Sequence, residues 1–212
     1  MSNRLNSNEG LDVCIVRTGI ANLASVLAGL RRAGARPRVT EKPAEVASAP
    51  AVVLPGVGAF GAGMQVLREN DLVAPLQQRI ADGRPTLAVC LGLQLLLESS
   101  EESPGEKGLG VVPGQARRFT GDIRVPQLGW NRVQPEHEDG LLRTGHAYFA
   151  NSYRLTEPPE GWRCARTEHG APFVSAFERG PVLACQFHPE LSARWGLELL
   201  GRWLTAAGGE PC

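Results

Sequence analysis

Residues 84–99 place a cysteine, Cys90, between a short apolar strand candidate and an apolar helix. A side chain at such a turn stands out from the sheet, and small residues on either side, here Ala88 and Gly92, let the turn pack closely. The first N–H groups and the positive end of the following helix favour the thiolate, the form of cysteine that attacks carbon. Cys90 is therefore a candidate nucleophile, although a cysteine in an apolar run is more often simply a core residue.

A second segment, Gln186–Glu190, supplies a histidine and a carboxylate. Pro189 disfavours helical dihedrals at His188, so we expect Phe187–Glu190 to be extended, with His188 and Glu190 on the same side. One imidazole nitrogen would then take the Cys90 proton while the Glu190 carboxylate holds the other nitrogen. The alternative is a histidine that ends a strand beside a solvated glutamate. Because both segments occur in one chain, we favour a Cys–His–Glu catalytic set.

The elements that must position these residues alternate between strand and helix in the first half of the chain. Strand candidates are Val13–Val16, Arg38–Thr40, Ala51–Leu54 and Thr86–Val89, and helices are expected from Leu23 to about Gly34 and, as one or two helices, within Val66–Ile80. This alternation predicts an α/β fold with a mostly parallel central sheet flanked by helices. Ligands bind beyond the carboxyl ends of such strands, where Pro55–Gly58, Cys90 and His188 all fall.

The second half of the chain has a different pattern. Short strand-like runs, separated by turn residues, cover Gly110–Phe119, Arg124–Val133, Ala147–Leu155, Arg163–Thr167, Pro172–Phe177 and Val182–Phe187. They predict additional antiparallel strands in the C-terminal half. A last helix is expected over Ala193–Ala206, and we expect its apolar face, which includes Leu199 and Trp203, to pack into the core.

Composition excludes several function classes. The chain has 212 residues with 22 basic and 22 acidic side chains, so no charge imbalance points to nucleic acid or an acidic membrane. Its five cysteines form no Cys-x-x-Cys pair, and Cys14 and Cys185 lie in apolar strand runs that predict core positions. The four histidines are scattered, so no metal site and no cofactor are expected.

We expect a disordered extension over residues 1–10, one domain over 11–207 and a flexible tail over 208–212. The first ten residues are polar and no apolar run approaches the roughly 20 residues that span a bilayer. We therefore expect a cytoplasmic protein.

Several motifs resemble a known family. Ala88–Gln94 and Phe187–Glu190 resemble the class I glutamine amidotransferases, whose fold is flavodoxin-like. Three further segments narrow the resemblance to the glutaminase subunits of imidazole glycerol phosphate synthase: Leu54–Gly61, Val125–Asn131 and Tyr148–Tyr153. The resemblance spans about residues 12–206. It implies that glutamine is hydrolysed through a thioester, and that ammonia passes to a separate TIM-barrel synthase subunit of histidine biosynthesis.

Attack on an amide carbonyl places negative charge on oxygen, so N–H donors must converge there. The Leu91 N–H, directly after the nucleophile, is one expected donor. The loop Pro55–Gly58 offers another because Gly56 lets the backbone approach closely and rotate. The resemblance assigns that second donor to the amide of Val57. A plain turn between a strand and a helix is the alternative for this loop.

The resemblance also implies which residues bind glutamine. Gln94 and Glu102 would contact the substrate, with a shift from Glu102 to Glu101 or Glu98 as the alternative. The backbone of Asn151, Ser152 and Tyr153 would receive the α-carboxylate.

The docking face for the barrel subunit is expected near Trp130, Asn131, Tyr148 and Leu191, with core packing an equal alternative for Trp130. Three positions depart from the family pattern. Arg17–Asn22 reads Arg-Thr-Gly-Ile-Ala-Asn in place of Asp-Tyr-Gly-x-Gly-Asn, Gln127 replaces a common histidine, and Leu191 replaces the usual lysine.

Two other functions remain open at this point. One is the glutaminase subunit of another amidotransferase, pyridoxal phosphate synthase, which lacks a Gly-Trp-Asn segment of this type. The other is a non-catalytic regulatory module on the same fold, against which the intact set Cys90, His188 and Glu190 argues.

Overall fold

The computed structural model describes residues 10–18 and 22–208. The expected N-terminal extension and C-terminal tail lie outside these residues except for Gly10 and Gly208. Residues 19–21 of the first motif that departs from the family pattern also lie outside them.

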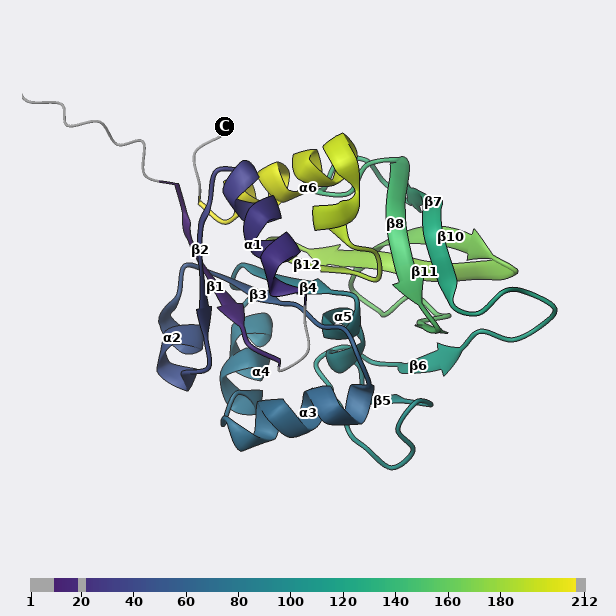
Figure 1. The fold of residues 1–212 in the computed structure, drawn as a ribbon, viewed down its shortest axis with the longest axis horizontal. Coiled ribbons are helices and arrows are strands. Elements are labelled where there is room, and N and C mark those ends of the chain that lie inside the picture. Colours follow the sequence, from purple (N-terminus) through teal and green to yellow (C-terminus); the bar gives the residue numbers. More distant parts are fainter. Residues whose placement is uncertain (1–9, 19–21, 209–212) are drawn as a thin grey trace, which may run out of the picture.

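Nine strands of the described residues form one mixed sheet (Figure 1), in the order β2-β1-β3-β4-β12-β11-β10-β7-β8. They are β1 (Asp12–Val16), β2 (Arg36–Thr40), β3 (Ala51–Leu54), β4 (Thr86–Val89), β7 (Gln127–Pro135), β8 (Gly145–Asn151), β10 (Arg163–His169), β11 (Ala171–Arg179) and β12 (Val182–Cys185). A small second sheet contains β5 (Ser99–Ser100), β6 (Gln115–Arg118) and β9 (Tyr153–Arg154). The strands β2, β1, β3, β4 and β12 pair in parallel, whereas the pairs β12–β11, β11–β10, β10–β7 and β7–β8 are antiparallel. The predicted α/β fold with appended antiparallel strands is thereby confirmed.

Helices cover both faces of the parallel part (Figure 1). They are α1 (Leu23–Arg32), α2 (Pro43–Ser48), α3 (Phe60–Glu69), α4 (Val73–Ala81), α5 (Leu91–Leu95) and α6 (Ala193–Ala206), with one 3₁₀ turn, η1 (Pro189–Leu191). Helices α1 and α6 lie on one face, and α2, α3 and α4 on the other. Every residue of β3 and β4 is buried, as expected for central strands covered on both sides.

The last helix packs as its periodicity predicts, with Leu199 and Trp203 fully buried. Cys14 and Cys185 are core residues, also as predicted. Two helical details were not predicted: α2 had no counterpart in the sequence interpretation, and α3 begins at Phe60, ahead of the expected Val66. None of the helices in the described part of the chain is long and apolar enough to cross a membrane.

The pairing of β4 with β12 decides where the site forms. In this parallel ladder Ala88 lies opposite Ala184 and Val89 lies opposite Cys185. The chain therefore leaves the two neighbouring strands at Cys90 and Gln186, which brings the two predicted catalytic segments together. Helix α1 approaches the second segment so closely that a Cβ added at Gly29 would lie 2.9 Å from the Cβ of Glu190.

Candidate active site

Cys90 is held in an unusual backbone conformation directly after β4. Its φ is 55° and its ψ is −108°, a region that non-glycine residues rarely adopt. Its N–H donates to the carbonyl of Cys185 at 2.8 Å, so β12 fixes the turn. A Cβ added at Gly92 would lie 2.0 Å from Leu54 O, so the chain after Cys90 packs against β3 only because residue 92 is glycine. The helix that follows is short, ending at Leu95, and its dipole is correspondingly weaker than expected.

The histidine and the glutamate are in contact. His188 Nδ1 lies 2.9 Å from Glu190 Oε1, and both residues are buried. The backbone corrects one prediction: His188 is extended, but Pro189–Leu191 forms the 3₁₀ turn η1. The fixed φ of Pro189 suits the first position of such a turn, and the Leu191 N–H donates to His188 O at 3.1 Å. The turn, and not an extended chain, carries the carboxylate back to the imidazole.

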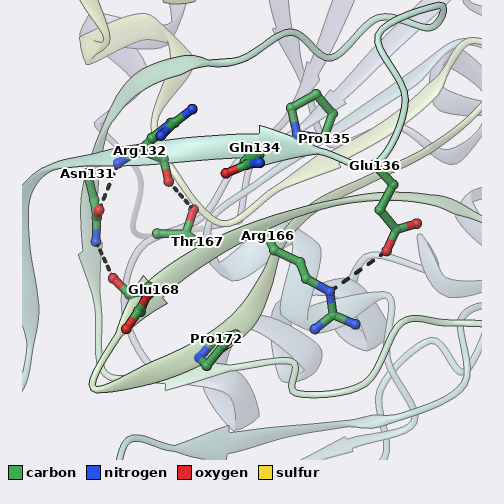
Figure 2. Close-up of a pocket in the computed structure, with 9 residues that line it drawn as sticks. All are labelled: Asn131, Arg132, Gln134, Pro135, Glu136, Arg166, Thr167, Glu168 and Pro172. Carbon is green, nitrogen blue, oxygen red and sulfur yellow. Dashed lines mark hydrogen bonds and ion pairs between the residues drawn. The ribbon is translucent and has the colours of Figure 1, made fainter.

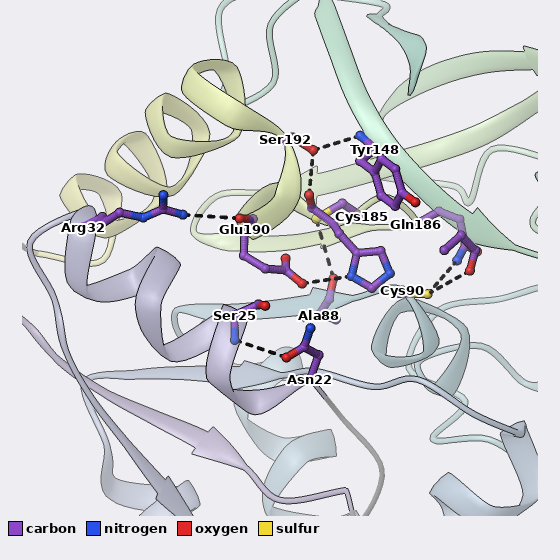
Figure 3. A network of polar contacts seen from close by, with 12 residues as sticks. Asn22, Ser25, Arg32, Ala88, Cys90, Tyr148, Cys185, Gln186, Glu190 and Ser192 are labelled. Atoms are coloured by element: carbon purple, nitrogen blue, oxygen red, sulfur yellow. Dashed lines mark hydrogen bonds and ion pairs between the residues drawn. The ribbon is translucent and has the colours of Figure 1, made fainter. Parts of the chain in front are cut away.

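Neighbouring elements brace this turn (Figure 3). Ser192 Oγ donates to His188 O at 2.6 Å and accepts from Tyr148 N at 3.0 Å, which ties η1 to β8. The His188 N–H donates to Tyr148 O at 2.9 Å. From α1, the Arg32 guanidinium reaches Glu190 O at 3.5 Å. The His188–Glu190 pair is therefore anchored to both β8 and α1.

The charges around His188 favour its protonated form. Burial alone lowers the pKa of His188, but hydrogen bonds and charge interactions with Cys90 and Glu190 outweigh it and raise the pKa to about 10. His188 is consequently an imidazolium at neutral pH, beside the Cys90 sulfur. Burial raises the pKa of the other described cysteines, Cys14, Cys164 and Cys185, which keeps them as unreactive thiols.

The predicted oxyanion donors lie together but are not both available. The Leu91 N–H donates to Gly56 O at 3.2 Å, so the carbonyl of the loop occupies this donor. A Cβ at Gly56 would lie 2.8 Å from the Cβ of Leu91, which shows how closely the loop approaches α5. The buried Thr18 hydroxyl donates to Pro55 O at 3.1 Å and holds the first residue of the loop.

A cavity of about 150 Å³ opens beside the sulfur. It is lined by Val57, Gly58, Cys90, Leu91, Gln94, Glu102, Ala150, Asn151, Ser152 and Tyr153. This volume is well below the several hundred Å³ of drug-sized sites, so it suits a small ligand such as an amino acid. The predicted glutamine-binding residues are all in this lining.

The structure distinguishes Glu102 from its two alternatives. Glu102 Oε2 accepts the Phe60 N–H at 2.7 Å, at the start of α3 and beside the cavity. In contrast, Glu101 accepts from the backbone of Arg118 and Glu98 from that of Gly114, both outside the cavity lining.

A larger cavity of about 620 Å³ lies elsewhere, between β7 and β10 (Figure 2). Asn131 Nδ2 donates to Glu168 O at 2.8 Å there, and Arg166 pairs with Glu136 at 3.8 Å. The Asn131 amide is therefore used within the chain, although the sequence placed this residue at a docking face. Mixed charges that already pair with one another give this cavity no clear ligand chemistry.

An exposed apolar surface adjoins the sulfur instead. Trp130 is 55% exposed, Leu128 61% and Leu191 39%, which excludes the core alternative for Trp130. The Trp130 ring meets the Tyr148 ring edge-on at 6.2 Å. Leu128 pairs with Ala150, whose carbonyl lies 4.0 Å from Cys90 Sγ. We call Leu128, Trp130, Tyr148 and Leu191 the apolar rim.

Sequence reasoning missed several residues around the site. The alternation along β7 could have revealed Leu128, two residues before Trp130 and on the same face. Thr18, Gln186 and Ser192 gave no signal of this kind, because their roles depend on contacts with distant segments. Gln127, at the position where a histidine is common, is buried with neither amide atom hydrogen-bonded.

Comparisons with known proteins agree with this geometry. Residues 18–203 match the family described as glutamine amidotransferase class-I. Imidazole glycerol phosphate synthase subunit HisH of Symbiobacterium thermophilum is 42% identical over 90% of this chain and 92% of its own length. The subunit of the same name from Herpetosiphon aurantiacus is 41% identical over 92% of this chain and 94% of its own length.

Among solved structures, one described as a glutamine amidotransferase has a TM-score of 0.74 and 22% identity, covering 92% of this chain and 98% of that one. PurLQS from Thermotoga maritima gives a TM-score of 0.71 at 14% identity, covering 92% of this chain and 98% of that one. At such identities these likenesses show the fold. The family match and the HisH relatives go further: this chain belongs to the class-I glutamine amidotransferases and, within them, to the HisH subunits of imidazole glycerol phosphate synthase.

Proposed function

We propose that this chain hydrolyses glutamine to glutamate and ammonia through Cys90, His188 and Glu190. The observation that carries the mechanism is the contact set at the ends of β4 and β12, where the buried His188–Glu190 pair stands beside the Cys90 sulfur. The thiolate attacks the side-chain amide of glutamine. The His188 imidazolium donates its proton to the departing ammonia, and water then releases glutamate from the thioester.

The cavity supports glutamine as the substrate. Gln94 and Glu102 offer acceptors for an α-ammonium group, and Asn151–Tyr153, whose backbone would bind the α-carboxylate, line the same cavity. No step in this reaction needs a cofactor.

We further propose that the ammonia goes to the TIM-barrel synthase subunit. That partner would use it to make imidazole glycerol phosphate and aminoimidazole carboxamide ribotide in histidine biosynthesis. The name of the relatives as synthase subunits supports this assignment, and the apolar rim supplies a surface beside the sulfur. Exposed aromatic and aliphatic anchors of this kind are typical of interfaces. The cytoplasmic location stays a prediction.

Activation by the partner has a physical basis in the loop Pro55–Gly58. In a trans peptide the C=O and the N–H point in opposite directions. Rotating the Gly56–Val57 peptide would turn Gly56 O away from Leu91 and bring the Val57 N–H to the same side. One rotation would thus free one oxyanion donor and supply a second. In the present conformation the isolated chain should hydrolyse glutamine slowly, because an oxyanion donor typically contributes about 3 kcal/mol.

The test is a glutaminase assay of the chain alone, with the barrel subunit, and with the subunit plus its synthase ligand. We expect a low rate alone and at least a hundredfold activation in the full complex, about what one oxyanion donor contributes. A rate that is high alone and unchanged by the partner would leave a free-standing glutaminase. No activity under any condition would favour the non-catalytic module.

A further inference from the structure

A buried amide outside the triad, that of Gln186, contacts the nucleophile. Gln186 Nε2 lies 3.7 Å from Cys90 Sγ as a hydrogen-bond donor, and the side chain is fully buried. Figure 3 shows the Gln186 amide turned toward the sulfur. The contact follows from the fold, because Gln186 and Cys90 are the first residues beyond the paired strands β12 and β4.

The orientation of this amide is fixed by a second one. Gln186 Oε1 accepts from Gln94 Nε2 at 3.0 Å, and Gln94 Nε2 also donates to Tyr153 O at 3.4 Å. Because the Tyr153 carbonyl can only accept, the Gln94 atom that faces it is the nitrogen. Gln186 must therefore present its oxygen to Gln94 and an N–H to the sulfur. A rotated Gln186 amide would place two donors against each other and an oxygen lone pair against the sulfur.

The groups around the Cys90 sulfur show why a Gln186 N–H donor would stabilise the thiolate. His188 is a hydrogen-bonding partner of the Cys90 sulfur. The Ala150 carbonyl oxygen, 4.0 Å from Cys90 Sγ, is an acceptor, so only the thiol form of Cys90 can bond to it. The other ionisable groups nearby are Cys185 on β12, Glu190 on η1, and Glu102 and Tyr153 in the cavity wall. None of these four is a cation that would favour a negative sulfur. A donor to the thiolate is consequently stabilising at this buried sulfur.

We infer that Gln186 is a positioning residue for Cys90: its N–H stabilises the thiolate and aims it into the cavity, and Gln94 keeps that N–H in place. This inference deepens the proposed glutamine hydrolysis and rests on it. It also defines what Gln94 does for the substrate. Both hydrogens of Gln94 Nε2 are used inside the chain, so its Oε1 accepts from the α-ammonium group of glutamine.

The decisive measurement is the pH profile of Cys90 alkylation by iodoacetamide in the full chain, read by peptide mass spectrometry. Gln186→Met keeps the length and burial of the side chain but removes the donor. We expect the pH profile of Cys90 alkylation to move upward by about one pH unit, so that the variant reacts about tenfold more slowly on the rising part of the profile. An unchanged profile overturns the inference.

Gln127→Met is the matched control, since it replaces a buried glutamine whose amide atoms have no hydrogen-bond partner. Its alkylation profile should equal that of the wild type. The same shift in both variants would mean that any buried Gln→Met change disturbs the site, and would also overturn the inference.

Two more variants keep the test decisive if Gln186→Met does not fold. Gln186→Glu is nearly isosteric, but its carboxylate accepts hydrogen bonds and repels the thiolate, so the profile should shift further upward than about one unit. Gln94→Met should shift it less, and the double variant with Gln186→Glu should shift no further than Gln186→Glu alone, because Gln94 acts on the sulfur through Gln186. No shift in Gln186→Glu, or additive effects, would contradict the inference.

Glutamine turnover with the barrel subunit separates this inference from the proposed function. Gln186→Met should lower kcat about tenfold and leave KM nearly unchanged, whereas Gln94→Met should raise KM. If wild-type chain with fully alkylated Cys90 still hydrolyses glutamine, the proposed mechanism itself fails, whatever the variants do.

Discussion

The triad and the oxyanion loop of this site differ in readiness. His188 and Glu190 are buried in contact at 2.9 Å, and the raised His188 pKa of about 10 already provides an imidazolium beside Cys90. The loop, by contrast, uses its own Gly56 carbonyl to occupy the Leu91 N–H. The groups proposed for attack and proton transfer are thus already in contact, whereas the Leu91 N–H proposed to bind the oxyanion is occupied. From this difference we expect control of the proposed reaction to act on a single peptide group and to leave the reacting side chains in place.

The largest effect should come from the nucleophile. Cys90→Ser should lower glutamine turnover by roughly four orders of magnitude or more, because a hydroxyl is far less ionisable than a thiol. Its thermal stability should match the wild type, measured by thermal unfolding. A glutamine-like electrophile should label Cys90 ahead of the buried Cys14, Cys164 and Cys185. Normal turnover in Cys90→Ser would remove Cys90 from the mechanism.

The two partners of the imidazole should differ from each other. His188→Ala removes the proton carrier and should lower kcat by roughly a thousandfold, whereas Glu190→Gln weakens its positioning and should lower kcat by roughly a hundredfold. Steady-state kinetics of the activated complex measure both. Equal, near-wild-type rates would refute the triad.

The pH dependence sharpens the same point. Since the imidazolium supplies the proton to ammonia, kcat should fall as the pH rises through about 10, where His188 loses its proton. Glu190 is one cause of that high pKa, so Glu190→Gln should move the alkaline decline to lower pH. The sign for folding is the same: the stability that this raised pKa contributes is complete below the ordinary value of 6.5 and is lost as the pH rises through about 10. If kcat declines at the same alkaline pH in the wild type and in Glu190→Gln, the assignment of this decline to His188 is contradicted.

Substitutions in the apolar rim should weaken binding of the barrel subunit and leave the reactivity of Cys90 unchanged. Trp130→Ala should weaken binding of the barrel subunit by about thirtyfold, the effect of losing an interface hot spot of about 2 kcal/mol. Alkylation of Cys90 in the isolated variant should be normal. Leu191→Lys should make the contact more polar and its affinity more sensitive to salt. Titration calorimetry at two salt concentrations measures the affinity of each variant and its salt dependence. Normal affinity in Trp130→Ala would mean that the barrel subunit docks on another face.

The smallest effect is expected at Thr18, whose hydroxyl holds the carbonyl of Pro55 at the start of the loop. Thr18→Val keeps the shape but leaves that carbonyl without its donor, which destabilises the resting loop by about 1 kcal/mol. The rate of the isolated chain should rise by about fivefold, and the activated rate should stay the same. Thr18→Ser retains a hydroxyl and serves as the control. If Thr18→Val has no effect on the basal rate, this bond does not hold the loop closed.

The sequence predicted the parts of this molecule that local patterns encode. Buried strands such as Ala51–Leu54 and Thr86–Val89 have the predicted bounds, because an apolar run of that length between turn residues has few alternatives. The final helix also agrees, since its 3.6-residue periodicity is unbroken over Ala193–Ala206. The motifs around Cys90 and His188 sit at strand ends, so the topology alone brings them together.

What escaped prediction depends on contacts between distant segments. The 3₁₀ turn at Pro189 is held by Ser192 and β8, and no local signal specifies that neighbour. The engagement of the Leu91 N–H by Gly56 and the amide contact of Gln186 with Cys90 likewise join residues far apart in the chain. Helix α2 is only six residues long, too short for its periodicity to be recognised.

The position of β12 in the sheet has a consequence for the chain during its synthesis. This strand lies in the middle of the sheet, between β4 and β11, although it comes last in sequence among the strands of the described residues. The pairing of β12 with β4 joins distant parts of the chain and is expected to form late, because the entropy of closing a large loop is lost before the strand contacts contribute free energy. A nascent chain on the ribosome therefore carries Cys90 without its histidine, its glutamate or Gln186. Until β12 and the residues that follow it have been synthesised, the chain lacks the proposed glutamine-hydrolysing site.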